Sequence, residues 1–191
     1  MPFSISRTYS SESFGGKPTL DEKILIFEDR VLVWHLGIAE LLDNHMRAKE
    51  QEGTDWNHAG FSLMNLLFTY FEMIAQYRSG TSSGGASKKM FCDGIEDVFP
   101  GQFSKETKED IYSRIRCGMY HNAFVKKSVL INGDYPKSIA AEDDGKGHTL
   151  IKVNPHRLSP ELNAHFRSYI SDLNVKAGTA LRNNFTTLFD S

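Results

Sequence analysis

Two arginines and a histidine, spaced as a phosphate-processing site would need them, lie between residues 114 and 121. The segment reads Arg114-Ile-Arg116-Cys-Gly-Met-Tyr-His121. Histidine titrates near neutral pH and transfers protons, whereas arginine binds phosphate oxygens through paired N–H donors and stabilises charge that develops on them. Together these residue types suffice, in principle, for attack of an RNA 2′-hydroxyl on the adjacent phosphate without a metal ion.

Helix geometry separates the two arginines. On a straight α-helix, Arg114, Gly118 and His121 share one face, with Arg114 and His121 about 20° apart and Gly118 leaving space between the two polar side chains. Arg116 points about 140° away from His121, so we expect these two to converge across the two-fold axis of a homodimer. The alternative is a solvated helix face whose arginines pair with nearby carboxylates: Glu106, Glu109 or Asp110.

Other polar residues are candidates for binding RNA or a nucleotide. Lys126 and Lys127 follow the segment and add attraction for phosphate. Glu72 stands out within an otherwise apolar helix, where it either reaches the site or is the buried partner of an arginine. The full set of these candidates is Glu72, Tyr112, Asn122, Lys126 and Lys127.

Composition limits the classes of protein. The chain has 191 residues, 40% hydrophobic and 24% charged, with a formal net charge of -2. This balance is typical of a globular domain, and any nucleic-acid binding must come from a local patch. No two histidines stand four residues apart, and Cys92 and Cys117 have no zinc-site spacing. We therefore expect no metal and no cofactor.

The sequence also predicts a location. The first residues lack the basic and apolar regions of a signal peptide, and no apolar stretch reaches the roughly 20 residues of a membrane helix. We expect a cytoplasmic protein without membrane association.

Apolar periodicity predicts a mainly α fold, a bundle of four to five helices with a small antiparallel β-hairpin before the last helix. Residues 1–18 are expected to form an irregular arm, and residues 19–191 a single domain. Thr19 with Glu22 predicts a capping box at the start of a helix over about 20–48. Thr54 or Asp55 is expected to cap the next helix, which is apolar on nearly every side and therefore central.

In the second half of the chain, the spacing of apolar residues changes from a helical to a strand pattern. A short helix is expected over 90–98, followed by one over 105–124 that Ser104 caps and Ile111, Ile115 and Met119 bury. Residues 128–131 and 149–153 then predict two antiparallel strands around a polar, glycine-rich turn, giving a hairpin over about 128–153. Ser159 and Pro160 are typical of a helix start, and this last helix is expected over about 159–189.

The motif segment resembles a known family. Arg116-Cys117-Gly118-Met119-Tyr120-His121, preceded by Ile111-Tyr112 and by an apolar helix containing Phe71-Glu72, resembles the HEPN superfamily (higher eukaryotes and prokaryotes nucleotide-binding domain). Its hallmark is an arginine, four to six residues, then a histidine, late in a small helical bundle. The resemblance covers residues 20–124, and residues 66–80 resemble the helix that precedes the motif helix.

The resemblance implies a bundle of four or five helices, often a homodimer, and in many members a metal-independent RNase of toxin–antitoxin, abortive-infection or other defence systems. RNA and an antitoxin protein would then be partners. His121 would be the general acid/base and Arg116 the phosphate-binding group, with Arg114 as the competing arginine. Active RNases of the family commonly have a polar residue after the arginine, where this chain has Cys117. A non-catalytic module that binds a nucleotide or a protein is therefore the alternative.

Overall fold

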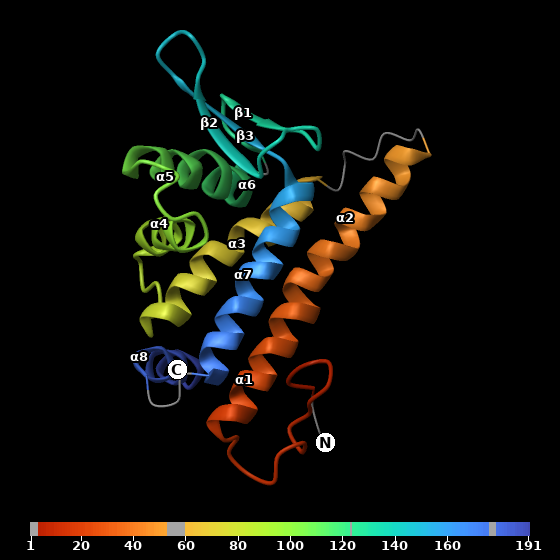
Figure 1. Ribbon diagram of the computed structural model, residues 1–191, viewed down its shortest axis with the longest axis vertical. Helices are drawn as coiled ribbons and strands as arrows, with labels where there is room; N and C mark the ends of the chain where they lie inside the picture. The colour runs from red at the N-terminus through yellow and green to blue at the C-terminus, as the bar shows by residue number, and fades with distance from the viewer. Residues whose placement is uncertain (1–3, 53–59, 123, 176–178) are drawn as a thin grey trace.

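Long helices packed side by side, with a small sheet at one end, make up the molecule (Figure 1). The structure is a computed structural model that describes residues 4–52, 60–122, 124–175 and 179–191. The prediction of a mainly helical bundle is confirmed. The helices are α1 (Leu20–Asp29), α2 (Leu36–Gln51), α3 (Gly60–Ser79), α4 (Ser87–Val98), α5 (Lys105–Ile111), α6 (Cys117–Asn122), α7 (Pro155–Val175) and α8 (Ala180–Phe189).

The first long helix begins as its sequence predicts. Thr19 accepts a hydrogen bond from the Glu22 amide, and the Glu22 carboxylate accepts one from the Thr19 amide, so the capping box is formed. A π-helical segment, Arg30–His35, joins α1 to α2, so that the two form one continuous long helix. The irregular arm that precedes α1 is held against the helix by Thr8, which donates to Asp29 through both its amide and its hydroxyl. The predicted caps Thr54 and Asp55 lie outside the described residues.

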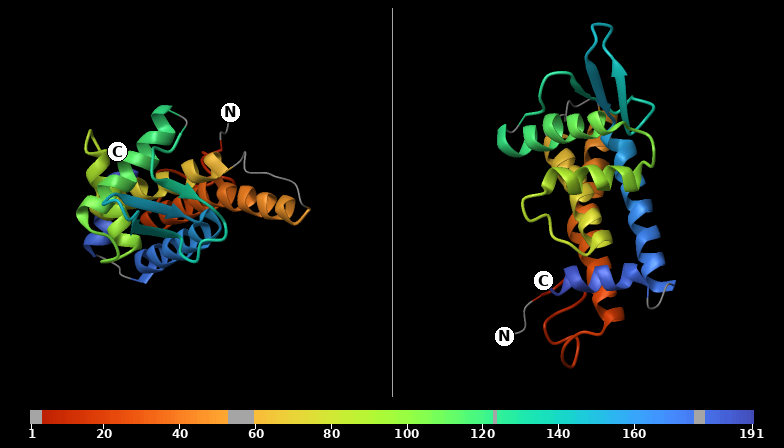
Figure 2. Two further views of the ribbon diagram at one scale, coloured as in Figure 1. Left: turned by 90° about the horizontal axis from the view of Figure 1, so that it is seen from above. Right: turned by 90° about the vertical axis from the view of Figure 1, so that its left-hand side faces the viewer.

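Helix α3 is the centre of the bundle, as its apolar surface predicts. It packs against α2, α4, α7 and α8, and Figure 2 shows α8 lying across the end opposite the sheet. Tyr70 and Phe71, two of its large side chains, have no exposed surface. At α4, Gly94 lies directly against the backbone of Phe71, so this pair of helices is in close backbone contact.

The helix with the motif contains a π-helical segment. Ser104 caps α5 by accepting a hydrogen bond from the Thr107 amide, as expected. The segment Tyr112–Arg116 is π-helical and joins α5 to α6. Ile111, Ile115 and Met119 are buried as predicted.

The sheet differs from the predicted hairpin. Its strands are β1 (Val129–Ile131), β2 (Ile139–Asp143) and β3 (Thr149–Val153), in the order β1-β3-β2. The antiparallel hairpin is formed by β2 and β3, while β1 pairs with β3 in parallel, Val129 opposite Ile151. The predicted antiparallel pairing of 128–131 with 149–153 is therefore wrong, because the polar stretch between them contains a strand of its own that occupies the other edge of β3.

The last helix also differs from the prediction. Asn154 accepts a hydrogen bond from the Arg157 amide and Pro155 is the first helical residue, so the cap lies one turn before the predicted Ser159-Pro160. Pro160 is inside α7 and has no N–H for the carbonyl of His156, four residues earlier. Arg47 donates to that carbonyl at 2.7 Å instead. The predicted helix over 159–189 is two helices, because α7 ends at Val175 and α8 begins at Ala180.

One hydrophobic cluster joins the helices and the sheet. It includes Ile24 of α1, Phe71 of α3, Ile151 of β3, Phe166 of α7 and Phe185 of α8. Within the described ranges, no helix is both long enough and apolar enough to cross a membrane.

Candidate functional site

Arg116 lies between aromatic rings and a carboxylate. Its Nη2 is 3.2 Å from Oε2 of Glu72 on α3, and its Cζ lies 4.9 Å from the ring centre of Tyr120 and 5.9 Å from that of Tyr112. The other carboxylate oxygen of Glu72 accepts a hydrogen bond from Ser87 Oγ at 2.7 Å. The interpretation of Glu72 as the partner of an arginine is confirmed, and the guanidinium is held by charge and by the faces of the rings.

His121 is exposed and contacts the same tyrosine. The imidazole meets the Tyr120 ring edge to face, with 5.2 Å between ring centres. Arg116 and His121, which a straight helix would point apart, therefore both contact one ring within a single chain. The homodimer, expected from the helix offset and from the resemblance, remains a prediction.

Arg114, the competing arginine, has a different environment. Its Nη1 donates to the carbonyl of Thr149 at 2.7 Å, and its Nη2 lies 2.6 Å from Oδ2 of Asp110. The pairing with Asp110 is the one expected for a helix-surface ion pair. The bond to Thr149 fastens the helix to the first residue of β3, so Arg114 holds the sheet in place.

We expect Arg114→Ala to destabilise the protein without removing any group that contacts Tyr120. Two charge-assisted hydrogen bonds are lost, and because the side chain is partly exposed we expect a loss of about 1–2 kcal/mol in the free energy of unfolding. Urea unfolding measures this. Arg114→Lys, which keeps the charge but not the paired geometry, should give a smaller loss. Wild-type stability in Arg114→Ala would show that the hydrogen bond from Arg114 to the Thr149 carbonyl is not formed.

Gly118 has a role other than the predicted one. The chain after α6 folds back over it: the Phe124 amide donates to the Gly118 carbonyl, and the Lys126 amide donates to the carbonyl of Arg114 at 2.9 Å. A Cβ at Gly118 would lie 2.5 Å from the Phe124 carbonyl oxygen. The expectation that Gly118 leaves space between Arg114 and His121 is wrong, because the returning backbone fills that space.

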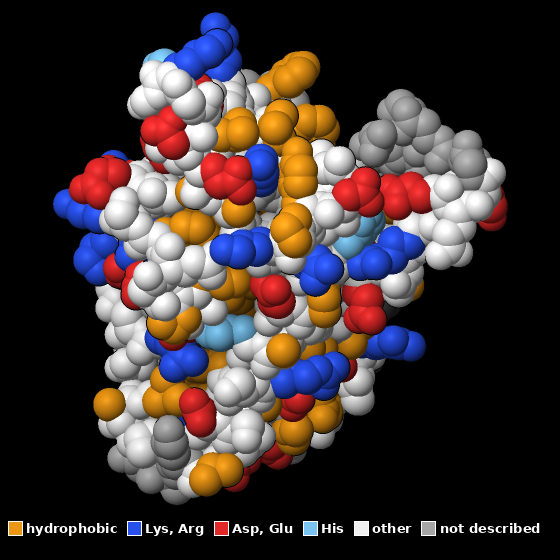
Figure 3. Space-filling model, turned by 45° about the horizontal axis from the view of Figure 1, so that its top comes forward, with side chains coloured by type: hydrophobic (Ala, Val, Ile, Leu, Met, Phe, Trp, Pro, Cys, Tyr) orange, Lys and Arg blue, Asp and Glu red, His pale blue; other side chains and the backbone are white. Residues whose placement is uncertain are grey.

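Because the chain after α6 folds back, Lys126 and Lys127 lie in a basic hollow. A hollow of about 930 Å³ is lined by Arg114, Phe124, Lys126, Lys127 and His148, among others. The structure therefore brings together both predicted lysines and adds a histidine from the β2–β3 turn. Figure 3 shows Lys and Arg side chains next to hydrophobic ones at the sheet end, a combination that suits phosphates and bases of a single strand.

The remaining predicted residues are Tyr112 and Asn122. Burial raises the pKa of the Tyr112 phenol, and the hydrogen-bonded Cys117 thiol beside it acts in the same direction. Tyr112 is therefore a neutral group at physiological pH, suited to packing on Arg116 rather than to proton abstraction. The side chain of Asn122 lies outside the described part of the structure.

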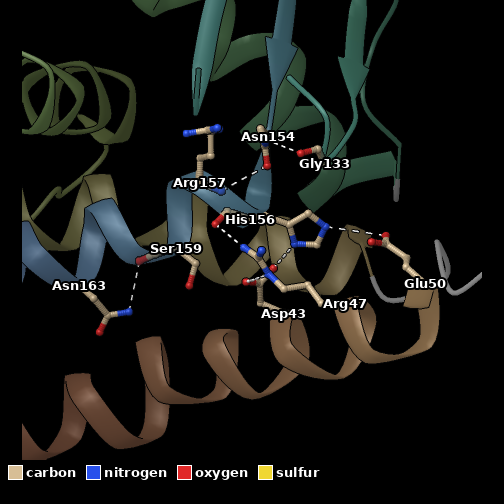
Figure 4. A network of polar contacts seen from close by, with 9 residues as sticks. All are labelled: Asp43, Arg47, Glu50, Gly133, Asn154, His156, Arg157, Ser159 and Asn163. Carbon is tan, nitrogen blue, oxygen red and sulfur yellow. Dashed lines mark hydrogen bonds and ion pairs between the residues drawn. The ribbon is translucent and has the colours of Figure 1, made fainter. Parts of the chain in front are cut away.

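A second polar cluster was not predicted. His156, near the start of α7, is bonded through Nδ1 to Oδ1 of Asp43, and its Nε2 faces Oε1 of Glu50 at 3.7 Å (Figure 4). Arg47 Nε donates to Asp43 Oδ2 at 3.0 Å. Asp43, Arg47 and Glu50 recur every three or four residues, the spacing of one helix face. The spacing of these three residues can be read from the sequence. Their contact with His156, which is 113 residues from Asp43 along the chain, cannot.

Comparison with known proteins adds no relative: no family model, curated protein or solved structure matches this chain. Among the described residues, no three His, Cys, Asp or Glu side chains are grouped so that they could hold a metal ion.

Proposed function

We propose that this protein binds single-stranded RNA at the end of α6 and cleaves it without a metal ion. The observation that carries the proposal is that Arg116 and His121 both contact the Tyr120 ring. Lys126 and Lys127, shortly after α6 in the sequence, line a basic hollow. Tyr120 and Phe124 are 70% and 69% exposed, which suits them to stack on bases.

The chemistry follows from the residue types. His121 accepts the proton of a 2′-hydroxyl, the 2′-oxygen attacks the adjacent phosphorus, and the bond from phosphorus to the 5′-oxygen breaks. The leaving 5′-oxygen takes a proton from histidinium or water, so the products are a 2′,3′-cyclic phosphate and a 5′-hydroxyl. Arg116 donates to the non-bridging oxygens, where negative charge increases in the transition state.

The spacing of the two residues supports a family assignment within this proposal. Arg116 and His121 are separated by four residues late in a helical bundle, which is the HEPN pattern. On that basis we propose a HEPN-like RNase that acts as a cytoplasmic homodimer in a defence or toxin–antitoxin system, with an antitoxin protein as its partner.

One observation favours a non-catalytic binding module as the second candidate. Glu72 is largely buried and already pairs with Arg116, so an incoming phosphate must compete with a carboxylate for the guanidinium. A module that stacks a nucleotide on Tyr120 needs no such exchange.

An RNA cleavage assay tests the proposal. Purified protein is incubated with a labelled single-stranded RNA in the presence of EDTA, and the ends of the products are identified. We expect cleavage that leaves 2′,3′-cyclic phosphate and 5′-hydroxyl ends. Binding of the RNA without cleavage would favour the second candidate, and products with 5′-phosphate ends would contradict the mechanism.

A further inference from the structure

The strand β1 has one side of its backbone free of any strand partner in the described sheet. It is at the edge of that sheet, next to β3, in the order β1-β3-β2 (Figure 1). The carbonyl of Ser128 and the amide of Asn132 bond to β3. Since backbone groups of successive residues point to opposite sides of a strand, Val129 and Ile131 direct their N–H and C=O groups away from β3.

This free side of β1 is open to pairing. Within the described part of the chain, no backbone hydrogen bond from another element reaches Val129 or Ile131. A strand edge with free donors and acceptors is a template on which a further extended chain can pair, and proteins use such edges to bind peptides. The edge of β1 therefore fits a peptide in an extended conformation.

An apolar hollow lies along the same strand. Its volume is about 480 Å³, and residues 129–133 line it consecutively, together with Met46 of α2 and Phe61 of α3. Leu130 and Phe61 are 45% and 38% exposed, so apolar surface is available beside the free edge. When a peptide strand is added to a sheet, pockets for its alternate side chains provide specificity. We expect an aliphatic side chain of the peptide to occupy this hollow.

The basic hollow determines the charge of the peptide. Residues 124–128, which lead directly into β1, line it consecutively, and Val125 lines both hollows. Its described lining residues include Lys126 and Lys127 but no Asp or Glu. Carboxylates are therefore the complementary groups for this end of the strand.

We infer that the free edge of β1 binds an extended peptide of a partner protein. An aliphatic side chain of the peptide lies in the apolar hollow, and one or two of its carboxylates lie toward Lys126 and Lys127. This inference goes beyond the proposed function and does not depend on RNA cleavage. Where RNA also uses these lysines, the peptide competes with it.

Synthetic peptides titrated under NMR observation test the inference. The probes are capped Thr-Val-Leu-Val-Asp-Glu and its reverse, Glu-Asp-Val-Leu-Val-Thr, for the two strand directions, each with a control that has two lysines in place of the acidic pair. We expect one acidic peptide to bind about tenfold more tightly than its control, because two attractive charge pairs become repulsive. Its binding should also slow hydrogen exchange of the Val129 and Ile131 amides. Equal affinity for acidic and lysine peptides, or no binding, would overturn the inference.

N-methylated peptides distinguish strand addition from attraction between charges. Only alternate residues of an added strand donate their N–H groups to β1. In the acidic peptide that binds, N-methylation of one alternate set of residues should therefore abolish binding, while N-methylation of the other set should change it little. Equal effects of the two sets would contradict pairing along the edge.

Two double variants of exposed or half-exposed lysines locate the charged end of the site. Lys126→Ala with Lys127→Ala should weaken the acidic peptide by about three- to tenfold, the usual range for two ion pairs in contact with water. Lys105→Ala with Lys137→Ala removes two exposed lysines that line neither hollow and should leave the affinity unchanged. Equal affinities of the two double variants would place the peptide elsewhere.

The apolar end of the site is tested at Phe61. Phe61→Ala removes part of the apolar lining and should weaken the acidic peptide by about fivefold or more, a typical loss when an aromatic contact at the centre of an interface is truncated. Trp34→Ala removes a ring of similar exposure that does not line the hollow and should have no effect. Wild-type affinity in Phe61→Ala would show that the hollow is not occupied.

The outcomes also separate this inference from the proposed function. Peptide binding by a protein that cleaves no RNA would reject the RNase and leave the docking edge. If an oligouridylate binds through Lys126 and Lys127 while neither acidic peptide binds, the basic hollow is a site for RNA and the inference is overturned.

Discussion

His121→Ala is expected to reduce RNA cleavage by about 10²- to 10⁴-fold, the usual contribution of a positioned proton-transfer group. The imidazole is exposed, and its ring contact is with Tyr120, so its removal should leave the fold unchanged. The measurement is the cleavage rate of one labelled RNA at saturating and at low concentration. A loss in kcat/KM with unchanged RNA binding is the result expected for a proton-transfer role.

Controls distinguish the site from the surrounding surface. Arg116→Ala should cost a comparable factor, about 10²- to 10³-fold, because it removes charge stabilisation at the phosphate. His45→Ala removes an exposed histidine on α2 and should have no effect on cleavage. If Arg114→Ala lowers the rate severely at wild-type stability while Arg116→Ala is mild, the assignment of Arg116 is wrong. EDTA-resistant activity that survives His121→Ala would place the catalytic group elsewhere.

Local sequence signals predicted those parts of the fold that local energetics decides. The capping box of Thr19 and Glu22 and the cap at Ser104 involve residues within one turn, so a pattern of four residues contains the whole interaction. The apolar surface of α3 and the stripe of Ile111, Ile115 and Met119 follow from burial at a fixed period.

The errors arose where a distant partner decides the outcome. Asn154-Pro155 and Ser159-Pro160 are equally good helix starts, and the longer helix forms because Arg47 satisfies the carbonyl that Pro160 leaves without a donor. The parallel pairing of β1 with β3 likewise depends on a neighbouring strand, β2, taking the antiparallel edge.

The candidate site was predicted in its residues but only in part in its contacts. The sequence named both Arg116 and Glu72, while their ion pair spans 44 residues between two helices. The π-helical segment Tyr112–Arg116 has no simple sequence signature, so the straight-helix angles did not describe the directions of these side chains. The cluster of His156 and Asp43 was also missed, because each residue alone is an ordinary polar residue on a helix.

The close contact of α3 with α4 predicts the largest change in stability. Alanine normally stabilises a helix relative to glycine by about 0.5–1 kcal/mol. At Gly94 we expect the opposite sign, because an added Cβ would lie 2.9 Å from the Cα of Phe71 and closer still to its carbonyl group. Overpacking typically costs about 1–3 kcal/mol, and since backbone rather than a rotatable side chain must move, we expect Gly94→Ala to lose about 3 kcal/mol or more.

Urea unfolding of a matched pair measures this effect. Gly60 is also helical, and among the described residues the nearest atom to an added Cβ there is the Met46 methyl at 3.9 Å, an ordinary van der Waals distance. Gly60→Ala should therefore be neutral or slightly stabilising. If Gly94→Ala unfolds at the same urea concentration as Gly60→Ala, the helices are farther apart than described. A large loss at Gly94 alone would show that the spacing of α3 and α4 is set by the absence of a side chain at Gly94.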